Sequence, residues 1–231
     1  MKLAIFDVDG TLVRSVAIDA SCYVRALAES LGIQGVDEQW VAASPLSDSG
    51  IMRQLFRERF GREPRRDEVG RMRSRFTQLL SEASYEEVPG AREGLLRLPA
   101  EGWAVGIATG GWRDCALTKL SRAGIEIAGL PAAFAEDGDL KVPIIEATCQ
   151  RAGGPFTNIV YFGDGPGDLS ASKTLGIAFV AVGRPLLGSS WIPDYTDWPR
   201  VTTMLAEVKA AIRDPEGRAA PQEAAQRRAH E

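Results

Sequence analysis

The chain has 231 residues, of which 45% are hydrophobic and 25% are charged, and its formal net charge is −4; such values are typical of a globular protein with one or two domains. The negative charge argues against nucleic acid as a partner, and no apolar run approaches the ~18 residues of a membrane span, so we expect no membrane partner either. The only histidine is His230, which excludes Ser-His triads and His-ligated zinc from the rest of the chain.

The three cysteines, Cys22, Cys115 and Cys149, are scattered along the chain. An odd number of dispersed cysteines favours reduced thiols and a cytoplasmic protein over a secreted protein with disulfides. The first residues, MKLAIF, run directly into the charge of Asp7, so we expect no signal peptide.

Residues 2–6 (KLAIF) form an apolar run that ends at a glycine-containing turn, which predicts a short buried strand. Asp7 and Asp9 follow at once, with Gly10 and Thr11 after them. Two carboxylates so close together repel each other and are costly to remove from water, so a compensating positive group is expected beside them. We expect Gly10 to permit the turn and Thr11 to hold it by hydrogen bonding.

Residues 15–87 carry the periodicity of helices and no strand pattern. Apolar residues recur at helical spacing over 15–31, 48–60 and 65–83, with Asp48 or Ser49 as the expected N-cap of the second helix. We therefore predict a helical domain over 15–87 that is inserted into an α/β domain.

From residue 88 onward, strands and helices alternate. Short loops between alternating strands and helices predict a doubly wound parallel sheet, built from residues 1–14 and 88–213. The polar residues 214–231 are expected to form a disordered tail. The expected strands span residues 103–109, 158–164 and 178–183, and the expected helices span 111–125, 144–153 and 168–177.

Polar residues stand where three of the expected strands end. The first strand is followed by Asp7 and Asp9, the second ends at Thr109, and the third ends at Asp164 with Asp168 in the next loop. Each residue alone is explained equally well as a turn or cap residue. Ligands of open parallel sheets bind beyond the carboxyl ends of the strands, so the set together predicts a metal-dependent site for an anion.

These motifs resemble those of the haloacid dehalogenase-like hydrolase superfamily, and most closely its phosphoglycolate phosphatase-like members. DVDGT (7–11), ATGG (108–111), a downstream lysine and GDGPGD (163–168) occur in the family's order, and the match covers residues 1 to about 200. The resemblance implies a Rossmann-like core with a helical cap, and a Mg2+-dependent phosphatase. Its substrate would be a small phosphate monoester, hydrolysed through an aspartyl phosphate by a monomer or homodimer.

The resemblance also implies roles for the acidic residues. Asp7 would be the nucleophile and a metal ligand, and Asp164 a second side-chain ligand of the metal. Asp9 would be the general acid and base, and its backbone carbonyl would also bind the metal. Asp168 would support the water shell of the metal. Members that displace halide lack the second aspartate, so Asp9 favours phosphoryl transfer.

Phosphate would be bound by Thr109, by the backbone amide of Gly110 and by a lysine. We assign that lysine to Lys141, although relatives often have Lys-Pro here and this chain has Lys141-Val142-Pro143. Lys119 is the rival, but its place within a helix suggests a solvated face.

The cap would set the choice of substrate. We expect hinges near residues 13–15 and 87–90, and we expect Ser47, Asp48 and Arg53 to contact the leaving group, although Asp48 is explained equally well as a helix cap. Arg14 would either contact a substrate carboxylate or be exposed.

Three alternatives stay open. A phosphomutase of the β-phosphoglucomutase type would use the same site, and a non-catalytic binding module would keep the same fold. A phosphonate hydrolase is disfavoured because the cap carries arginines and no convincing lysine. The physiological substrate does not follow from the sequence.

Overall fold

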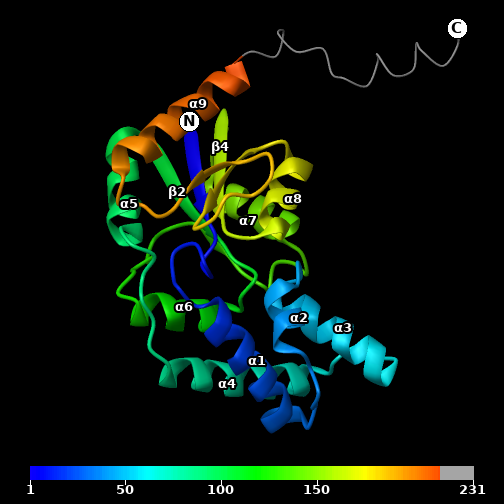
Figure 1. The fold of residues 1–231 in the computed structure, drawn as a ribbon. Helices are drawn as coiled ribbons and strands as arrows, with labels where there is room; N and C mark the ends of the chain where they lie inside the picture. The colour runs from blue at the N-terminus through cyan, green and yellow to red at the C-terminus, as the bar shows by residue number, and fades with distance from the viewer. Residues whose placement is uncertain (214–231) are drawn as a thin grey trace, which may run out of the picture.

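The protein is described here by a computed structural model of residues 1–213, with side chains to residue 206, so the expected tail at 214–231 lies outside the described residues. The predicted doubly wound sheet is confirmed: parallel strands form one sheet in the order β3-β2-β1-β4-β5-β6 (Figure 1). The strands are β1 (Lys2–Phe6), β2 (Trp103–Ala108), β3 (Ala132–Ala133), β4 (Asn158–Gly163), β5 (Ala178–Val182) and β6 (Ser190–Ile192).

Helices cover both faces of this sheet (Figure 1). The side chains of β1 alternate between the faces, as the geometry of a strand requires: Leu3 and Ile5 pack in one apolar cluster, and Ala4 and Phe6 pack in the other. A strand buried on both faces has to be apolar throughout, which explains the uninterrupted run in the sequence. The helices of this part are α5 (Ala91–Arg97), α6 (Arg113–Arg122), α7 (Lys141–Ala152), α8 (Pro166–Leu175) and α9 (Trp198–Arg213), with a short 3-10 helix at Leu98–Glu101.

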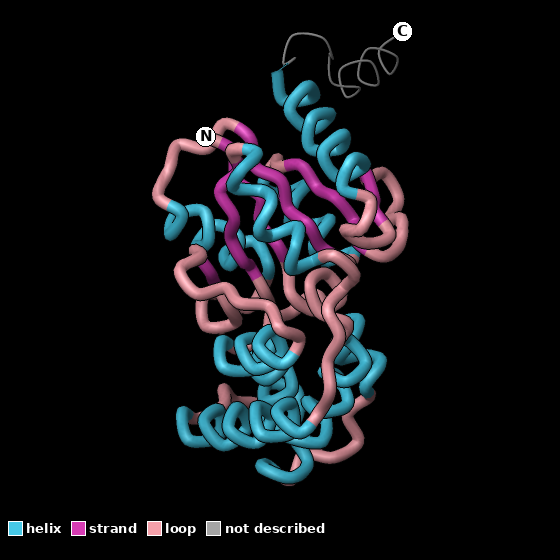
Figure 2. The backbone as a smooth tube through the Cα atoms, turned by 90° about the vertical axis from the view of Figure 1, so that its left-hand side faces the viewer, coloured by secondary structure: helices cyan, strands magenta, loops and turns pink. Residues whose placement is uncertain are grey.

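The segment between β1 and α5 is helical, as its periodicity predicts, and lies beyond the carboxyl ends of the strands (Figure 2). Its contact with the rest of the protein includes an aromatic cluster, in which Tyr23 and Trp112 stack at 6.0 Å between ring centroids and Phe76 meets the edge of both. Because Trp112 follows β2, this cluster joins the insertion to the sheet domain. The helices of the insertion are α1 (Val16–Leu31), α2 (Glu38–Ala43), α3 (Asp48–Phe60) and α4 (Arg66–Glu82).

The chain enters and leaves the insertion along two neighbouring segments. The Arg14 amide donates to the Glu86 carbonyl at 2.9 Å, and the Val88 amide donates to the Leu12 carbonyl at 2.8 Å. Both crossings lie where the sequence predicts hinges. Among the described residues, no helix is both long and apolar enough to cross a membrane.

Several local predictions need correction. The N-cap of α3 is Ser47, whose hydroxyl accepts from the Gly50 amide at 3.2 Å, and not Asp48 or Ser49. Helix α7 begins at Lys141 instead of residue 144, because a proline within the first turn of a helix costs no hydrogen bond. The elements α2, β3 and β6 were not predicted, since each is too short to show a periodic pattern.

Candidate active site

A cavity of about 330 Å³ lies between the carboxyl ends of the strands and the insertion. The strand side of its wall contains the residues that the sequence places at strand ends, and the opposite side contains residues 41–46 of α2 and the following loop. This position agrees with the rule for open parallel sheets. The residues predicted at strand ends line this wall, together with Lys141, which the family resemblance indicated; the strand-end residues are Asp7, Asp9, Thr109, Gly110, Asp164 and Asp168.

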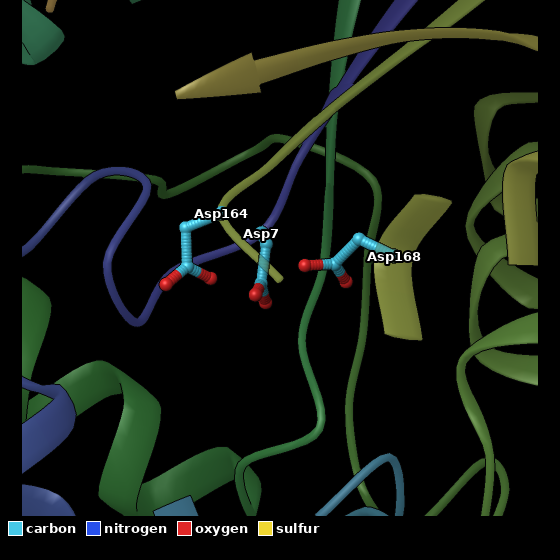
Figure 3. Close-up of side chains that lie close together, drawn as sticks. All are labelled: Asp7, Asp164 and Asp168. Atoms are coloured by element: carbon cyan, nitrogen blue, oxygen red, sulfur yellow. The ribbon is translucent and has the colours of Figure 1, made fainter. Parts of the chain in front are cut away.

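Three carboxylates converge on the strand side of the cavity. Asp164 and Asp168 lie on either side of Asp7 (Figure 3), and one oxygen from each lies within 4.8 Å of the others. Burial, together with Asp168, Asp164 and Asp9, raises the pKa of Asp7 to about 8 despite the adjacent Lys141. Burial and Asp168 raise the pKa of Asp164 to about 6. The cluster therefore has an excess of negative charge.

This cluster fits a hard divalent cation. Mg2+ prefers oxygen ligands and is commonly held by one or two carboxylates, with water and substrate phosphate completing its shell. Within the described part of the chain, the buried Oδ1 of Asp7 has no hydrogen-bond partner, although the ammonium of Lys141 lies 2.6 Å from it. Asp168 is already held by the Tyr161 hydroxyl at 3.0 Å and the Gly165 amide at 3.1 Å, which leaves Asp7 and Asp164 the freer ligands.

The turn after β1 brings Asp164 close to the backbone of Gly10. A Cβ added at Gly10 would lie 2.2 Å from Oδ2 of Asp164, and the φ of Gly10 is +73°. Glycine is therefore required here both by the left-handed backbone and by the lack of space. Thr11 does hold the turn by hydrogen bonding, but through its backbone: the amides of residues 11–13 donate to the Val8 carbonyl, whereas the buried Thr11 hydroxyl oxygen has no hydrogen-bond partner among the described residues.

Lys141 occupies the predicted position beside the first aspartate. As the first residue of α7, it places its ammonium nitrogen 2.6 Å from Oδ1 of Asp7 and 3.1 Å from Oδ1 of Asp168. Burial lowers the pKa of Lys141, but the carboxylates of Asp168 and Asp7 outweigh it and hold the pKa above its ordinary value. The lysine is therefore charged where it lines the cavity.

Lys119 corrects the sequence interpretation most sharply, because its side chain is 0% exposed instead of solvated. Its ammonium nitrogen lies 2.7 Å and 2.8 Å from the two carboxylate oxygens of Asp9, and it also pairs with Asp19. Spacing does contain a signal for this: Lys119 follows Cys115 and Ala116 by four and three residues, which places it on the apolar face of α6. That face is covered because the insertion packs over it.

Asp9 therefore has its own lysine, as Asp7 does. The Ser15 hydroxyl also donates to Oδ1 of Asp9, at 2.5 Å. Burial raises the pKa of Asp9, but Lys119 and Ser15 outweigh this effect and leave the pKa below its ordinary value. The two aspartates of DVDGT are thus in opposite electrostatic environments.

The loop after β2 connects the cavity to the insertion. Thr109 is buried, and its hydroxyl oxygen accepts from the Gly111 amide at 3.2 Å. The Gly110 carbonyl accepts from the Asp48 amide at 2.8 Å, and a Cβ on Gly110 would lie 3.4 Å from Cα of Ser47. A methyl group here would make only an ordinary van der Waals contact, so it is the hydrogen bond between Asp48 and Gly110 that joins the insertion to this loop.

The residues predicted to contact the substrate from the cap side divide into two groups. Asp48 lines the cavity, and its carboxylate accepts from the Trp112 amide at 2.8 Å, while Ser47 caps α3. Arg14 and Arg53 are not among the described residues that line the cavity. Arg14 is exposed, with its guanidinium 3.6 Å from the Glu86 carboxylate, and Arg53 pairs with Asp139 at 2.7 Å.

Sequence reasoning missed Asp19 and Arg184, which also line the cavity. Asp19 lies on α1 beside the buried Ala20, and its carboxylate pairs with Lys119. A charged residue next to the apolar stripe of an amphipathic helix was the available signal for Asp19. Arg184 follows β5, so its place at a strand end was the corresponding signal.

Comparison with known proteins identifies the family. The family model described as "Haloacid dehalogenase-like hydrolase" matches residues 4–182, which is well over half of the chain. No curated protein is similar enough in sequence to match.

The chain also resembles solved structures, all at identities that establish the fold alone. A hydrolase from Pseudomonas syringae superposes with a TM-score of 0.70 at 21% identity, covering 88% of this chain and 99% of the other. A β-phosphoglucomutase from Clostridium difficile has a TM-score of 0.69 at 17% identity, covering 91% and 99%. A protein described as a predicted phosphoglycolate phosphatase from Haemophilus somnus 129PT has a TM-score of 0.57 at 22% identity, covering 87% and 98%. With its motifs at the ends of a parallel sheet and a family model that spans most of it, the chain belongs to the haloacid dehalogenase-like hydrolases.

Proposed function

We propose that this protein is a Mg2+-dependent phosphatase that hydrolyses a small phosphate monoester through an aspartyl-phosphate intermediate. One observation carries the proposal: Asp7 lines a cavity with Lys141 at 2.6 Å, two further carboxylates beside it, and Asp9 two residues away. This set supplies a nucleophile, positive charge for a phosphate and a separate group for proton transfer.

Asp7 and Asp164 would hold the cation, with the carbonyl of Asp9 as a third ligand and Asp168 supporting its water shell. When bound, Mg2+ supplies positive charge that offsets the charge of the phosphoryl group. Lys141 adds a further positive charge, and Thr109 with the Gly110 amide would bind phosphoryl oxygens.

The first half of the reaction transfers the phosphoryl group to the protein. A carboxylate oxygen of Asp7 forms a bond to phosphorus while the bond from phosphorus to the leaving oxygen breaks. The leaving oxygen takes a proton from Asp9 and departs as an alcohol. The incoming phosphate brings up to about two negative charges, which raise the proton affinity of Asp9 and so favour the protonated form that this step needs.

The second half regenerates the enzyme. Asp9 takes a proton from water, whose oxygen attacks phosphorus while the bond to the Asp7 oxygen breaks. Inorganic phosphate leaves, and Asp7 returns to its carboxylate form. The two aspartates therefore have separate roles, in agreement with their separate lysines.

The insertion would act as a cap that excludes bulk water and leaves room for the attacking water molecule. We assign residues 15–87 to this cap and residues 1–14 and 88–213 to the catalytic core, with hinges at the paired crossings near Arg14 and Val88. Closing such a site strengthens every electrostatic interaction within it and limits unproductive hydrolysis. Asp48 lines the cavity from the cap side and is our candidate for contact with the leaving group.

The direct test is a screen of small phosphate monoesters with Mg2+ and with EDTA. We expect release of inorganic phosphate only with the metal, and a loss of several orders of magnitude in Asp7→Asn. Asp67→Asn, on the exposed face of α4, is the matched control and should retain activity. Unchanged turnover in Asp7→Asn would contradict the proposal, and isomerisation of a sugar phosphate without phosphate release would indicate a phosphomutase instead.

A further inference from the structure

We propose that Lys119 is a positioning residue for the reaction: it orients the carboxylate of Asp9 so that Oδ2 is the oxygen that exchanges a proton with the leaving group. The inference rests on the proposed phosphatase function and deepens it. It adds a second lysine, on a different element and with a different task from Lys141, to the site.

The contacts of Lys119 fix the plane of the Asp9 carboxylate. The ammonium nitrogen reaches both oxygens, at 2.7 Å from Oδ1 and 2.8 Å from Oδ2, and the Ser15 hydroxyl adds a bond to Oδ1 at 2.5 Å. When both carboxylate oxygens accept from the Lys119 ammonium, and Oδ1 also accepts from the Ser15 hydroxyl, the carboxylate cannot rotate freely about its Cβ–Cγ bond. Lys119 thereby removes rotational freedom of the Asp9 carboxylate that would otherwise have to be lost when the transition state forms.

The same contacts distinguish the two oxygens of Asp9. Oδ1 accepts from two donors, Ser15 and Lys119, whereas Oδ2 accepts only from Lys119 among the described residues. Each carboxylate oxygen has two lone pairs, so Oδ1 is saturated and Oδ2 retains room for one more partner. Asp9 lines the cavity with 21% of its side chain exposed, so a substrate can reach the remaining lone pair.

A purely structural role explains Lys119 poorly. Its buried neighbours on α6 are Cys115, Ala116 and Leu120, and an apolar side chain would fill the same space without a charge. A buried ammonium is costly to desolvate, and replacing a buried ion pair by apolar residues is often neutral or stabilising. A fully buried lysine that contacts a cavity-lining carboxylate is therefore better explained by what it does to that carboxylate.

The third contact of Lys119 links this arrangement to the cap. Asp19 lies on α1, the first helix of the insertion, and pairs with the Lys119 ammonium. Ser15 immediately precedes the same helix. Two of the partners that hold Asp9 and Lys119 in place thus come from the start of the insertion, and the orientation of Asp9 depends on the ion pair between Asp19 of α1 and Lys119 of α6.

The test compares two substrates that differ in their need for a proton. An alkyl phosphate leaves as an alkoxide, which requires protonation, whereas p-nitrophenyl phosphate leaves as a stable phenolate that does not. The quantity to measure is kcat/KM, because it reports transfer to Asp7 and excludes the later hydrolysis. For Lys119→Met, we expect kcat/KM to fall about 100-fold or more with the alkyl phosphate, within the range of general acid catalysis, and only about threefold or less with p-nitrophenyl phosphate.

Two variants complete the comparison. Asp9→Asn should show the same selective loss, and Lys173→Met, at an exposed position of α8, should show none. If Lys119→Met does not fold, Lys119→Gln takes its place, since it keeps a polar side chain at this position but removes the charge and the contact with both oxygens; its loss should again be larger for the alkyl phosphate. Equal losses for the two substrates would overturn the proposal. If the unaltered protein hydrolyses neither substrate, the proposed function itself fails, and the two failures are thereby distinguished.

Discussion

At the scale of single residues, the two aspartates of DVDGT differ in the balance between burial and compensating charge. Asp7 faces two other carboxylates and one lysine, and its pKa rises to about 8. Asp9 faces Lys119 and Ser15, and its pKa falls below the ordinary value. The opening motif thus places one carboxylate where a cation is needed and the other where positive charge is already present.

The raised pKa of Asp7 predicts that replacing this residue changes the stability of the protein in a pH-dependent way. Asp7 binds its proton more tightly in the folded state than in the unfolded state. The protonated carboxyl therefore contributes fully to the free energy of unfolding below about pH 4, and this contribution is lost as the pH rises through about 8. Without metal, Asp7→Asn should therefore be more stable than the parent at pH 9, by on the order of 1 kcal/mol or about 2–4 °C in Tm, and this advantage should shrink at pH 5.

Thermal unfolding in EDTA at both pH values measures this effect. The exposed Asp67→Asn is the control and should change Tm little at either pH. A lower Tm for Asp7→Asn than for the parent at pH 9 would show that its charge is already compensated in the metal-free protein.

At the scale of elements, the turn after β1 is constrained by its neighbour strand. Parallel pairing of β1 with β4 places Phe6 beside Phe162, so the chain must turn next to the residues that follow β4. Gly10 lies in that turn, and its Cα packs against the side chain of Asp164. The position of a proposed metal ligand is thus coupled to the backbone of the motif that carries the nucleophile.

Substitution of Gly10 tests this coupling. Gly10→Ala adds backbone strain of about 1 kcal/mol and a clash with Asp164, which together should destabilise the fold by about 2–4 kcal/mol. Gly124→Ala is the matched control: its φ of +74° is almost the same, and among the described residues nothing lies within 4 Å of an added Cβ. It should show the backbone strain alone.

Urea unfolding measures the difference between the two variants, and the Mg2+ concentration that gives half-maximal activity reports the displacement of Asp164. Only Gly10→Ala should require more metal. Equal destabilisation of the two variants would mean that Asp164 moves away from the new methyl group without cost.

At the scale of the whole molecule, the cavity is made by two parts of the chain that meet. The sheet domain supplies the three clustered carboxylates and Lys141, and the insertion supplies Asp19, Asp48 and the wall at residues 41–46. Burial of the carboxylates in the assembled protein raises the pKa values of Asp7 and Asp164. Metal binding by the assembled protein must therefore compete with protons.

This competition predicts that Mg2+ binds more tightly as the pH rises. With pKa values of about 8 for Asp7 and about 6 for Asp164, binding at pH 6–7 should release protons, and affinity should rise by about tenfold per pH unit for each proton displaced. Calorimetric titration in buffers of different ionisation enthalpy measures the protons released. Asp164→Asn should bind the metal weakly and release fewer protons, whereas pH-independent affinity in the parent would contradict this account.

The chain sequence was sufficient to predict the sheet, the helical insertion and the main residues at the strand ends. The predicted strands match β1, β2, β4 and β5 because strands buried on both faces must be continuously apolar. Asp7, Thr109 and Asp164 could be placed at one edge because parallel strands end on the same side. Short elements such as β3 and α2 were missed because a few residues show no period.

The tertiary structure alone decided which polar residues join the site and which do not. Lys119 and Arg14 are both basic residues near the motifs, yet Lys119 is buried against Asp9, and Arg14 is exposed beside Glu86. The difference arises because the insertion covers the face of α6 that carries Lys119, whereas the side chain of Arg14 stays 59% exposed. Local sequence determines which face of a helix is apolar, but the element that covers this face comes from a distant part of the chain, and only the assembled fold brings the two together.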